Sequence, residues 1–545
     1  MRYCPNPFVR QRRPTREVKV GNVGIGGSNP IRIQTMLTSD TMDTDACVRE
    51  AIPILEAGCE LLRLTVPSVA AARKLRDFVA EIRKRGFGTP VVADVHFLPA
   101  AAMEAALWVE KVRINPGNFA DRKKFVVREY TDAEYRQELE RVERTFVPLV
   151  LRLKQLGRAL RIGVNHGSLS DRIMNRYGDT PLGMVESALE FVRICRKHNY
   201  HDIVISMKSS NVKVMIQANR LLVARLAEEG PDWNYPLHLG VTEAGEGEDA
   251  RIKSAIGIGA LLADGIGDTI RVSLTEPSIN ELPFCRQLVE WAARPFRAVS
   301  VEAVSEARDP FSYKRRGSRE LQIAGVGVGG ANPVRVCARE GGEFSPDAPQ
   351  ILEVNPLAMP ELAGQPVRLL TVGSDVPLEP IAAYRLLAAR AADWPILLRD
   401  HSGDLVSASV NLGALLCDGI GDAIEVDGPV SLAYGILQAA GCRYHKAEYI
   451  ACPSCGRTQF DLQAVTARIK ERTQHLRGVK IAIMGCIVNG PGEMADADFG
   501  YVGTAPGRVS LWVGKQPVKE HIPEEQAVEE LVALIKQHGK WVEPS

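Results

Sequence analysis

Residues 160–210 read LRIGVNHGSLSDRIMNRYGDTPLGMVESALEFVRICRKHNYHDIVISMKSS. An apolar, β-branched run at 160–167 precedes a helical pattern at 181–199, and a second apolar run follows at 202–210. Short buried runs that alternate with helices are typical of parallel strands joined by helical connections. This stretch therefore predicts one β–α–β unit of a parallel sheet.

The same alternation extends through the first half of the chain. Apolar runs lie at 31–36, 61–66, 90–97, 111–117, 160–167, 202–210, 236–245 and 269–274, and helical patterns separate most of them. Eight strands that alternate with helices predict a (β/α)8 TIM barrel, and the protein is therefore expected to be of the α/β class. In that fold the active site is built at the C-terminal ends of the strands.

Polar side chains occupy those strand ends. They are Arg63, Asp94, His96, Arg113, Asn115, Arg161, Asn165, Lys208, Glu243, Arg271 and Ser273. Converging cations are costly to bury unless an anion is bound, and arginine and lysine suit phosphate oxygens. We therefore expect a ligand with more charge than one carboxylate, such as a diphosphate. Taken alone, any one of these arginines is as compatible with a salt bridge, His96 with a structural histidine, and Glu243 with a proton donor or acceptor.

The middle of the chain repeats parts of this first domain. The segment 24–36 returns at 327–339, the segment 257–272 returns at 411–426, and RLTV at 63–66 has a partner in RLLTV at 368–372. Two matches in the same order indicate an internal duplication. The copy is shorter, lacks the RINPG, VNHG and VTEAG motifs, and has Glu425 where the first copy has Arg271. We expect a barrel-like insert with a structural role, which gives domains at 1–295, 296–444 and 445–545.

The last domain contains three cysteines and a glutamate in a distinctive pattern. ACPSCGR at 451–457 carries Cys452 and Cys455, while IMGCIVNGPGE at 483–493 carries Cys486 and, after a turn, Glu493. Zinc sites usually close with a fourth cysteine or a histidine, whereas an iron–sulfur cluster held by thiolates tolerates one different ligand. An exchangeable carboxylate on one iron would give that iron Lewis-acid as well as redox character. The pattern favours a 4Fe-4S cluster, with zinc as the alternative.

The remaining patterns of the C-terminal domain predict a small α/β fold. Helical patterns lie at 461–476 and 524–539, and strand patterns lie at 479–486, 499–503 and 508–514.

The bulk composition narrows the classes of function. The chain has 545 residues, 45% of them hydrophobic and 24% charged, and its net charge of +1 points to neither nucleic acid nor an acidic surface. No apolar window reaches about 18 residues, and the basic N-terminus has no apolar core, so no membrane span or export signal is expected. The eleven cysteines are then expected to be reduced, in a cytoplasmic protein. No dinucleotide-binding fingerprint follows a strand, so electrons would come from a separate protein.

Six motifs carry a resemblance to a known family. RINPGN (113–118), RIGVNHGSL (161–169), PLHLGVTEAG (236–245), KSAIGIGALLADGIGDTIRVSLT (253–275), CPSCGR (452–457) and GCIVNGPGE (485–493) together resemble the 4-hydroxy-3-methylbut-2-enyl diphosphate synthases. These are iron–sulfur enzymes of the non-mevalonate (methylerythritol phosphate) isoprenoid pathway. The resemblance covers nearly all of the first and last domains, and the insert is similar to the long form of the family. His166 departs from the short form, in which alanine is usual.

The resemblance implies a reaction and a set of roles. The substrate would be 2-C-methyl-D-erythritol 2,4-cyclodiphosphate, which two electrons from ferredoxin or flavodoxin open and dehydroxylate. The cluster is expected on Cys452, Cys455, Cys486 and Glu493. The strand-end cations, with Asn115, Asn165 and Ser273, would bind the diphosphate. Glu243 would donate a proton to the departing hydroxyl, with Asp94 and His96 orienting the substrate.

The resemblance also implies a closure of two domains. In the short form the cluster domain of one subunit caps the barrel of its partner in a homodimer. Whether this chain closes within itself or between chains is open at the level of sequence. Two alternatives of other kinds are a zinc-stabilised phosphosugar-binding protein and a non-redox cluster enzyme of the hydratase type.

Overall fold

The computed structural model describes residues 1–121, 129–295, 299, 301, 304, 306, 308–338, 340–346, 350–455, 457–487, 494 and 497–544. The chain divides into two compact units. The barrel unit comprises residues 14–250, 267–286 and 446–545, and the insert unit comprises residues 1–13, 251–266 and 287–445. None of the described helices is long and apolar enough to cross a membrane.

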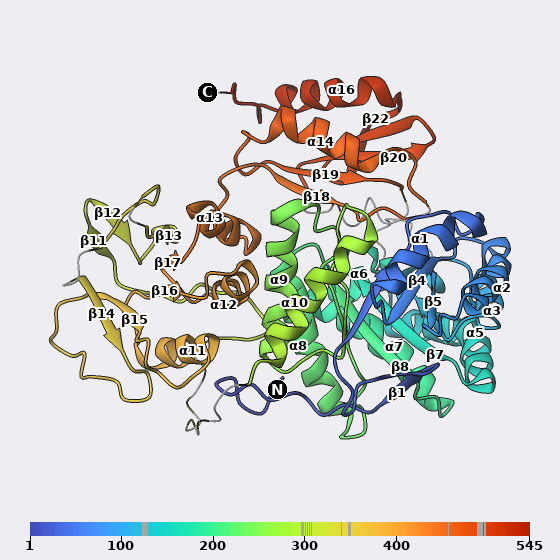
Figure 1. The fold of residues 1–545 in the computed structure, drawn as a ribbon, viewed down its shortest axis with the longest axis horizontal. Helices are drawn as coiled ribbons and strands as arrows, with labels where there is room; N and C mark the ends of the chain where they lie inside the picture. Colours follow the sequence, from blue (N-terminus) through green and yellow to red (C-terminus); the bar gives the residue numbers. More distant parts are fainter. Residues whose placement is uncertain are drawn as a thin grey trace. The chain divides into compact units, whose positions relative to one another are not determined.

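Eight parallel strands in the described part of the barrel unit form a TIM barrel (Figure 1). They are β3 (Arg32–Met36), β4 (Leu61–Thr65), β5 (Val91–Val95), β6 (Lys111–Ile114), β7 (Ala159–Asn165), β8 (Ile203–Lys208), β9 (His238–Leu239) and β10 (Thr269–Ile270). They pair in the order β8-β7-β6-β5-β4-β3-β10-β9, and a parallel bridge between Ile205 and Leu237 joins the two ends of the sheet. The predicted barrel is confirmed, because each predicted run contains one of these strands.

Helices connect the strands of the barrel. They are α1 (Thr44–Glu56), α2 (Val69–Lys84), α3 (Pro99–Ala105), α4 (Pro116–Phe119), α5 (Asp132–Leu156), α6 (Asp171–Tyr177), α7 (Pro181–Lys197), α8 (Val212–Glu229), α9 (Gly247–Ala263) and α10 (Glu281–Ala293), with 3-10 turns at His166–Ser168 and Ser278–Asn280. Polar residues start several of them by accepting hydrogen bonds from first-turn N–H groups, as Asp43 does at α1 and Ser68 at α2. At α5, Thr131 and Glu134 form a capping box.

A hairpin covers the N-terminal end of the barrel. Its strands are β1 (Val18–Val20) and β2 (Val23–Ile25), which pair antiparallel. Their buried side chains form one apolar cluster with Leu61, Ala159 and Val204, which lie within the first two positions of β4, β7 and β8. Most of the predicted site residues lie at the opposite end of the barrel.

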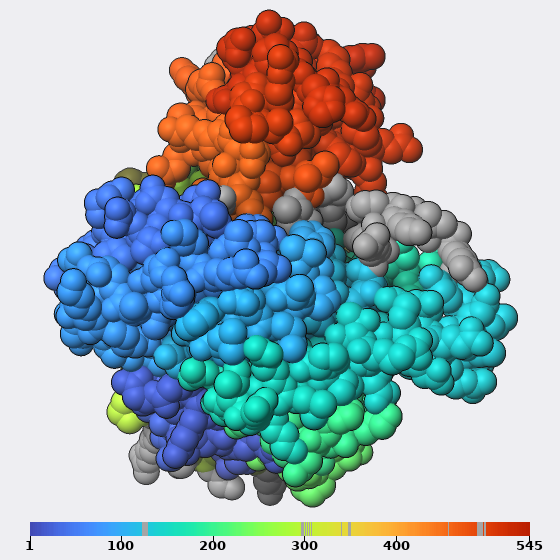
Figure 2. Space-filling model, turned by 90° about the vertical axis from the view of Figure 1, so that its right-hand side faces the viewer, coloured from blue at the N-terminus to red at the C-terminus, as the bar shows by residue number. Residues whose placement is uncertain are grey.

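The C-terminal domain (residues 446–545) contains a mixed sheet. Its strands are β18 (Glu448–Ala451), β19 (Lys480–Met484), β20 (Phe499–Ala505), β21 (Arg508–Val513) and β22 (Gln516–Pro523), with helices α14 (Leu462–Thr473) and α16 (Glu524–Gln537). The strands pair in chain order; β18, β19 and β20 are parallel, and β21 and β22 are antiparallel. The predicted elements are confirmed, and β22 is an additional edge strand whose exposed, polar residues give no alternating pattern. Figure 2 shows this domain in orange and red beside the blue and cyan surface of the barrel.

The insert unit contains a shorter set of parallel strands. They are β13 (Arg335–Val336), β14 (Ile351–Val354), β15 (Leu369–Val372), β16 (Leu397–Asp400) and β17 (Ala423–Val426), with a hairpin of β11 (Leu321–Ile323) and β12 (Val326–Val328) and helices α11 (Pro380–Arg390), α12 (Leu405–Cys417) and α13 (Val430–Ala439). β14 pairs with β15, a bridge joins Leu370 to Ile396 just before β16, and β16, β17 and β13 follow.

Hydrogen bonds around the two hairpins confirm the internal duplication. Arg32 donates to the carbonyl of Gly24, as Arg335 does to that of Gly327. Asp268 accepts from the Leu237 amide and Asp422 from the Ile396 amide.

One predicted correspondence is wrong. The RLLTV strand, β15, lies beside β16 rather than beside β13, so it takes the place of β8 and not that of β4, which carries RLTV. The short L-T-V pattern is common to buried strands and does not identify one of them.

Candidate active site

Most predicted site residues line one cavity of about 80 Å³ at the C-terminal end of the barrel. The predicted residues among its lining are Arg63, His96, Arg113, Arg161, Asn165, Lys208, Glu243, Arg271, Ser273, Cys452, Cys455 and Cys486. The fold thus brings side chains of seven barrel strands and their following loops together with all three predicted cysteines. Asp94 and Asn115 lie outside this lining, and Glu493 lies outside the described residues.

Asp94 holds two of the arginines in place. Its side chain is fully buried, Arg63 Nη2 donates to its Oδ2 at 2.8 Å, and Arg113 Nη1 donates to its Oδ1 at 2.8 Å. Burial alone would raise the pKa of Asp94, but Arg63, Arg113 and His96 outweigh it and hold the pKa well below its usual range. The carboxylate therefore positions cations and is not a proton donor at neutral pH.

The described part of the protein offers little negative charge to balance the cationic side chains of Arg161 and Lys208. Arg161 is 1% exposed, and its Nε and Nη1 have no hydrogen-bond partner in the described part of the chain. Burial first, and then neighbouring arginines, lower the pKa of both side chains well below their usual values. Nitrogen atoms in such a position are ready to donate to an anion, and an anion would restore the charged form of Lys208.

Arg271 is held differently. Its Nε and Nη2 donate to the two carboxylate oxygens of buried Glu281 at 3.0 and 2.9 Å. Burial lowers the pKa of Arg271, but Glu281 raises it by more, so the guanidinium stays charged. These two hydrogen bonds fix the orientation of the Arg271 side chain, which reaches the cavity from the end of β10.

His96 is a neutral hydrogen-bond acceptor in this arrangement. Arg113 Nη1 lies 2.6 Å from His96 Nε2, and because an arginine can only donate, the imidazole nitrogen accepts. Burial lowers the pKa of His96 to about 3, although Asp94 acts in the opposite direction. The neutral ring is suited to orienting a ligand hydroxyl.

Glu243 stands in an unusual backbone conformation. Its φ is +50°, a region that non-glycine residues seldom adopt, and its side chain is buried. Thr242 Oγ1 donates a hydrogen bond to Glu243 Oε2. Such outliers cluster at functional sites, and here the turn aims a carboxyl group into the cationic cavity.

Asn115 caps a helix. Its Oδ1 accepts from the Gly117 amide at the start of α4, and its Nδ2 donates to Ser168 Oγ at 2.7 Å. Its predicted role toward substrate stays a prediction.

Arg457 is a functional candidate that the sequence analysis did not single out. Its Nε lies 3.5 Å from Cys455 Sγ and its Nη2 lies 3.9 Å from Asp94 Oδ2, so it joins the thiol loop to the barrel. Burial lowers the pKa of Arg457, while Cys455, Asp94 and Cys486 raise it by more. Its position two residues after Cys455 was visible in the sequence, but its barrel contact was not.

The three thiols fit the ligand set of an iron–sulfur cluster. They face one cavity, and the backbone amide of Gly485 donates to Cys452 Sγ at 3.3 Å. A cluster brings its own sulfide and spreads its thiolate ligands over several irons, so this donor set fits it.

The C-terminal domain contacts the barrel of its own chain. Thr275 Oγ1 donates to the carbonyl of Cys452 at 2.9 Å, and Gln463 donates to the carbonyl of Thr275 at 2.9 Å. The ion pairs Lys446–Asp249 and Lys470–Glu246 join the same two parts. The thiol loop and the cationic residues of the barrel strands of one chain therefore line one cavity.

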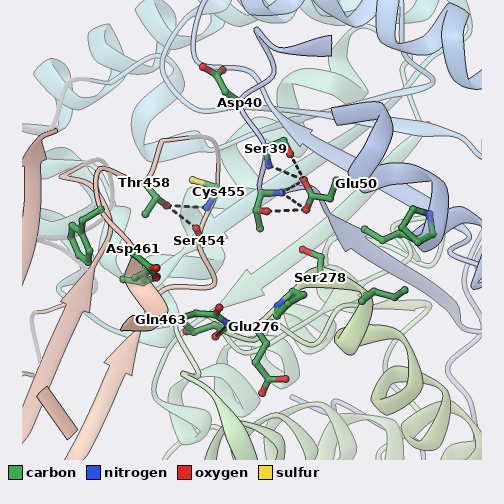
Figure 3. Close-up of a pocket in the computed structure, with 18 residues that line it drawn as sticks. Ser39, Asp40, Glu50, Glu276, Ser278, Ser454, Cys455, Thr458, Asp461 and Gln463 are labelled. Atoms are coloured by element: carbon green, nitrogen blue, oxygen red, sulfur yellow. Dashed lines mark hydrogen bonds between the residues drawn. The ribbon is translucent and has the colours of Figure 1, made fainter. Parts of the chain in front are cut away.

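A groove of about 790 Å³ reaches Cys455 from the other side (Figure 3). Ser454, Cys455 and Thr458 line both the groove and the cavity. The described lining of the groove has four carboxylates, those of Asp40, Glu50, Glu276 and Asp461, and no lysine or arginine. In Figure 3, Glu50 is hydrogen-bonded to Ser39 and lies across from the turn in which Cys455 is hydrogen-bonded to Thr458. The groove is therefore acidic, whereas the cavity that shares Ser454, Cys455 and Thr458 with it is lined by cations.

Comparison with known proteins gives consistent matches to both parts of the barrel unit. Residues 15–286 match the GcpE TIM-barrel domain, and residues 448–537 match the GcpE protein C-terminal domain. The chain is 54% identical to a 4-hydroxy-3-methylbut-2-en-1-yl diphosphate synthase (flavodoxin) of Akkermansia muciniphila over 99% of both chains. It is 45% identical to the protein of that name from Leptospira interrogans, over 100% of this chain and 99% of the relative. The chloroplastic, ferredoxin-named synthase of Arabidopsis thaliana is 40% identical, over 100% of this chain and 90% of the relative.

Proposed function

The chain belongs to the GcpE family, and from this premise we propose that it reduces 2-C-methyl-D-erythritol 2,4-cyclodiphosphate to (E)-4-hydroxy-3-methylbut-2-enyl diphosphate. In this reaction two electrons enter, the ring C–O bond to phosphate breaks, and a hydroxyl leaves as water. The observation that carries the proposal is that three cysteines and a layer of buried cations line the same cavity.

The cations account for binding of the substrate. Arg161 and Lys208 lack compensating charge in the described structure, and Arg63, Arg113 and Arg271 are held in fixed orientations by Asp94 and Glu281. A cyclic diphosphate supplies the negative charge that this layer needs, while Asn165 and Ser273 add neutral donors. The cavity of about 80 Å³ is smaller than pockets of roughly 300–1,000 Å³ that bury small ligands. Substrate binding therefore requires the C-terminal domain to move away from the barrel.

Cys452, Cys455, Cys486 and Glu493 are the proposed ligands of a 4Fe-4S cluster. When bound, the cluster supplies the two electrons and an iron that can accept a substrate oxygen. Glu243 then holds a proton in the cavity for the departing hydroxyl, and neutral His96 orients a substrate hydroxyl. Asp94 keeps Arg63 and Arg113 in place, and the closed cavity excludes water.

The electron donor is proposed from the names of the relatives. The bacterial relatives are named for flavodoxin and the plant relative for ferredoxin, so a small electron-transfer protein of one of these kinds is the expected partner. A homodimer and the division at residues 295 and 444 stay predictions. Within this division we propose that the insert has no catalytic residue, because Arg335 bonds to Gly327 and Glu343 and Glu425 bonds to Arg399.

Anaerobic purification tests the proposed function. We expect about four irons per chain, a charge-transfer spectrum, and product only when both the cyclodiphosphate and a reductant are present. Product formed without a reductant would support the hydratase alternative, and zinc in place of iron would support the binding-protein alternative.

Glu243→Gln tests the proton donor. Because general acid catalysis contributes typically 10²–10⁴-fold, we expect turnover to fall by about that factor with the cluster spectrum unchanged. Glu276→Gln, in the acidic groove, is the matched control and is expected to keep wild-type turnover. Equal activity of Glu243→Gln would remove this residue from the mechanism.

A further inference from the structure

A second cation-lined cavity lies in the insert unit. It has a volume of about 270 Å³ and is lined by Phe8, α11, the turn that follows α12, and residues 306, 308, 309, 312 and 314–317. It shares no residue with the catalytic cavity, and no part of the proposed reaction uses it.

Cations outnumber carboxylates in the lining. Five cationic side chains, Arg308, Lys314, Arg315, Arg316 and Arg385, face three carboxylates, Glu306, Asp309 and Asp418. Asp418 is already paired with Arg308 and Arg385, and Asp309 accepts hydrogen bonds from its own turn at Phe311 and Ser312. Outside the lining, Asp264 pairs with Arg385 and Asp422 with Arg315. Among the cations of the lining, Lys314 and Arg316 are therefore the two that form no ion pair in the described part of the chain.

These two side chains keep donors available. Arg316 donates only to the backbone carbonyls of Gly317 and Trp394, and its Nε is buried without a partner in the described part of the chain. Lys314 is exposed, and no hydrogen bond or ion pair to it occurs among the described residues. Carbonyl oxygens do not neutralise a guanidinium, so both charges are open to an anion.

A buried guanidinium completes the cavity. Arg385 is 4% exposed; its Nε donates to Asp418 at 2.9 Å and its Nη1 to Asp264 at 2.8 Å. Its Nη2 has no hydrogen-bond partner among the described residues. Buried polar nitrogens are nearly always satisfied, so an unsatisfied one beside a cavity indicates a missing acceptor.

Comparison of the two copies of the internal duplication shows that Lys314 is found only in the copy that forms this cavity. The Gly265 turn of the first copy packs against the carbonyl of Gln11, and the Gly419 turn packs in the same way against that of Lys314. Likewise the Arg13 amide donates to Gly265 and the Arg316 amide to Gly419. Lys314 thus stands where the first copy has neutral Gln11, so the cation is not required by the shared turn.

We propose that this cavity binds a small molecule that carries a phosphate or diphosphate group. Arginine forks and a lysine match phosphate oxygens, and Phe8, Ala388 and Ile420 provide an apolar wall for a short carbon skeleton. The volume of about 270 Å³ is near the lower limit of small-molecule sites, roughly 300 Å³. The ligand binds outside the catalytic cavity, so the protein has two sites for phosphorylated molecules.

Titration of the full-length, cluster-loaded protein with inorganic diphosphate, and in parallel with inorganic phosphate, tests the proposal. At constant ionic strength we expect two classes of site. Arg113→Ala removes the catalytic class and keeps the second class. Lys314→Glu keeps binding at the catalytic cavity and weakens binding at the second cavity by at least about tenfold. This is the effect of losing one charge-assisted hydrogen bond. Lys515→Ala, an exposed lysine of the C-terminal domain, is the matched control and keeps both classes.

The outcomes separate clearly. Tighter binding of one probe identifies the group that the cavity recognises. A single class that Arg113→Ala abolishes, or a second class that neither Lys314→Glu nor Arg316→Gln weakens, overturns the proposal. Because turnover is not measured, the result does not depend on the proposed reaction, and a wild-type melting temperature of Lys314→Glu excludes misfolding.

Discussion

Replacing Arg457 with methionine should lower the reduction potential of the bound cluster. The guanidinium is the only cation hydrogen-bonded to a proposed cluster ligand in the described structure, with Nε 3.5 Å from Cys455 Sγ. Its side chain is 15% exposed, so solvent screens it only in part. Removing a positive charge beside the cluster favours the oxidised form, which carries less negative charge.

The magnitude follows from Coulomb's law. At an effective dielectric constant of about 20, a unit charge at 3.5 Å interacts by about 5 kcal/mol. The added electron is spread over the cluster, so we take about twice that separation, which gives about 2.4 kcal/mol, or roughly 100 mV for a one-electron step.

A redox titration followed by electron paramagnetic resonance measures the shift. Arg457→Lys keeps the charge and is the matched control, with an expected shift of less than roughly 30 mV. Iron analysis and the visible spectrum establish that both variants are fully loaded. A fully loaded Arg457→Met protein whose potential lies within roughly 20 mV of wild type would refute the reasoning, because the charge would then be screened or compensated.

Three further predictions concern stability. The unfolded chain binds a proton on His96 near pH 6.5, whereas the folded chain binds it only near pH 3. The free energy of unfolding should therefore fall as the pH drops from about 6.5 toward 3. His96→Gln should flatten this part of the pH profile of urea unfolding. Glu281→Gln leaves Arg271 buried without its ion pair and should lower the free energy of unfolding in urea by about 3–5 kcal/mol. Lys197→Met, at an exposed ion pair, should lower it by less than about 1 kcal/mol, and equal losses would contradict the role of Glu281. A Cβ at Gly259 would lie 2.3 Å from Val410 Cγ2, so Gly259→Ala should destabilise the insert unit by about 1–3 kcal/mol. If crowding is the cause, adding Val410→Ala should restore most of the lost stability.

The strand ends of the barrel could be predicted from the sequence because their neighbours along the chain define them. Arg113 and Arg161 each lie inside an apolar run that must be buried, and in a parallel barrel neighbouring runs pair side by side, as β6 and β7 do at these two arginines. The same local reasoning placed Cys486 at the end of β19 and the two helices of the C-terminal domain.

Local patterns failed where partners are far apart in the chain. The sequence did not show that the Asn115 side chain caps α4 and bonds to Ser168, and its role toward substrate stays a prediction. It offered β15 as the counterpart of β4, but pairing of strands places it beside β16. The contacts that make Glu281 and Arg457 important could not be read from the sequence, because they are made with Arg271, Asp94 and Cys455.

The sequence by itself determined the alternation of strands and helices, the identity of the thiols and the cations, and the family to which they belong, since each of these is written in local pattern and spacing. Only the tertiary structure decided that the Cys452–Cys455 loop meets the barrel of its own chain, that His96 is neutral, and that Arg385 and Lys314 line a second cavity. The physical reason is that burial and electrostatic partners depend on contacts across hundreds of residues, and no local pattern records those contacts.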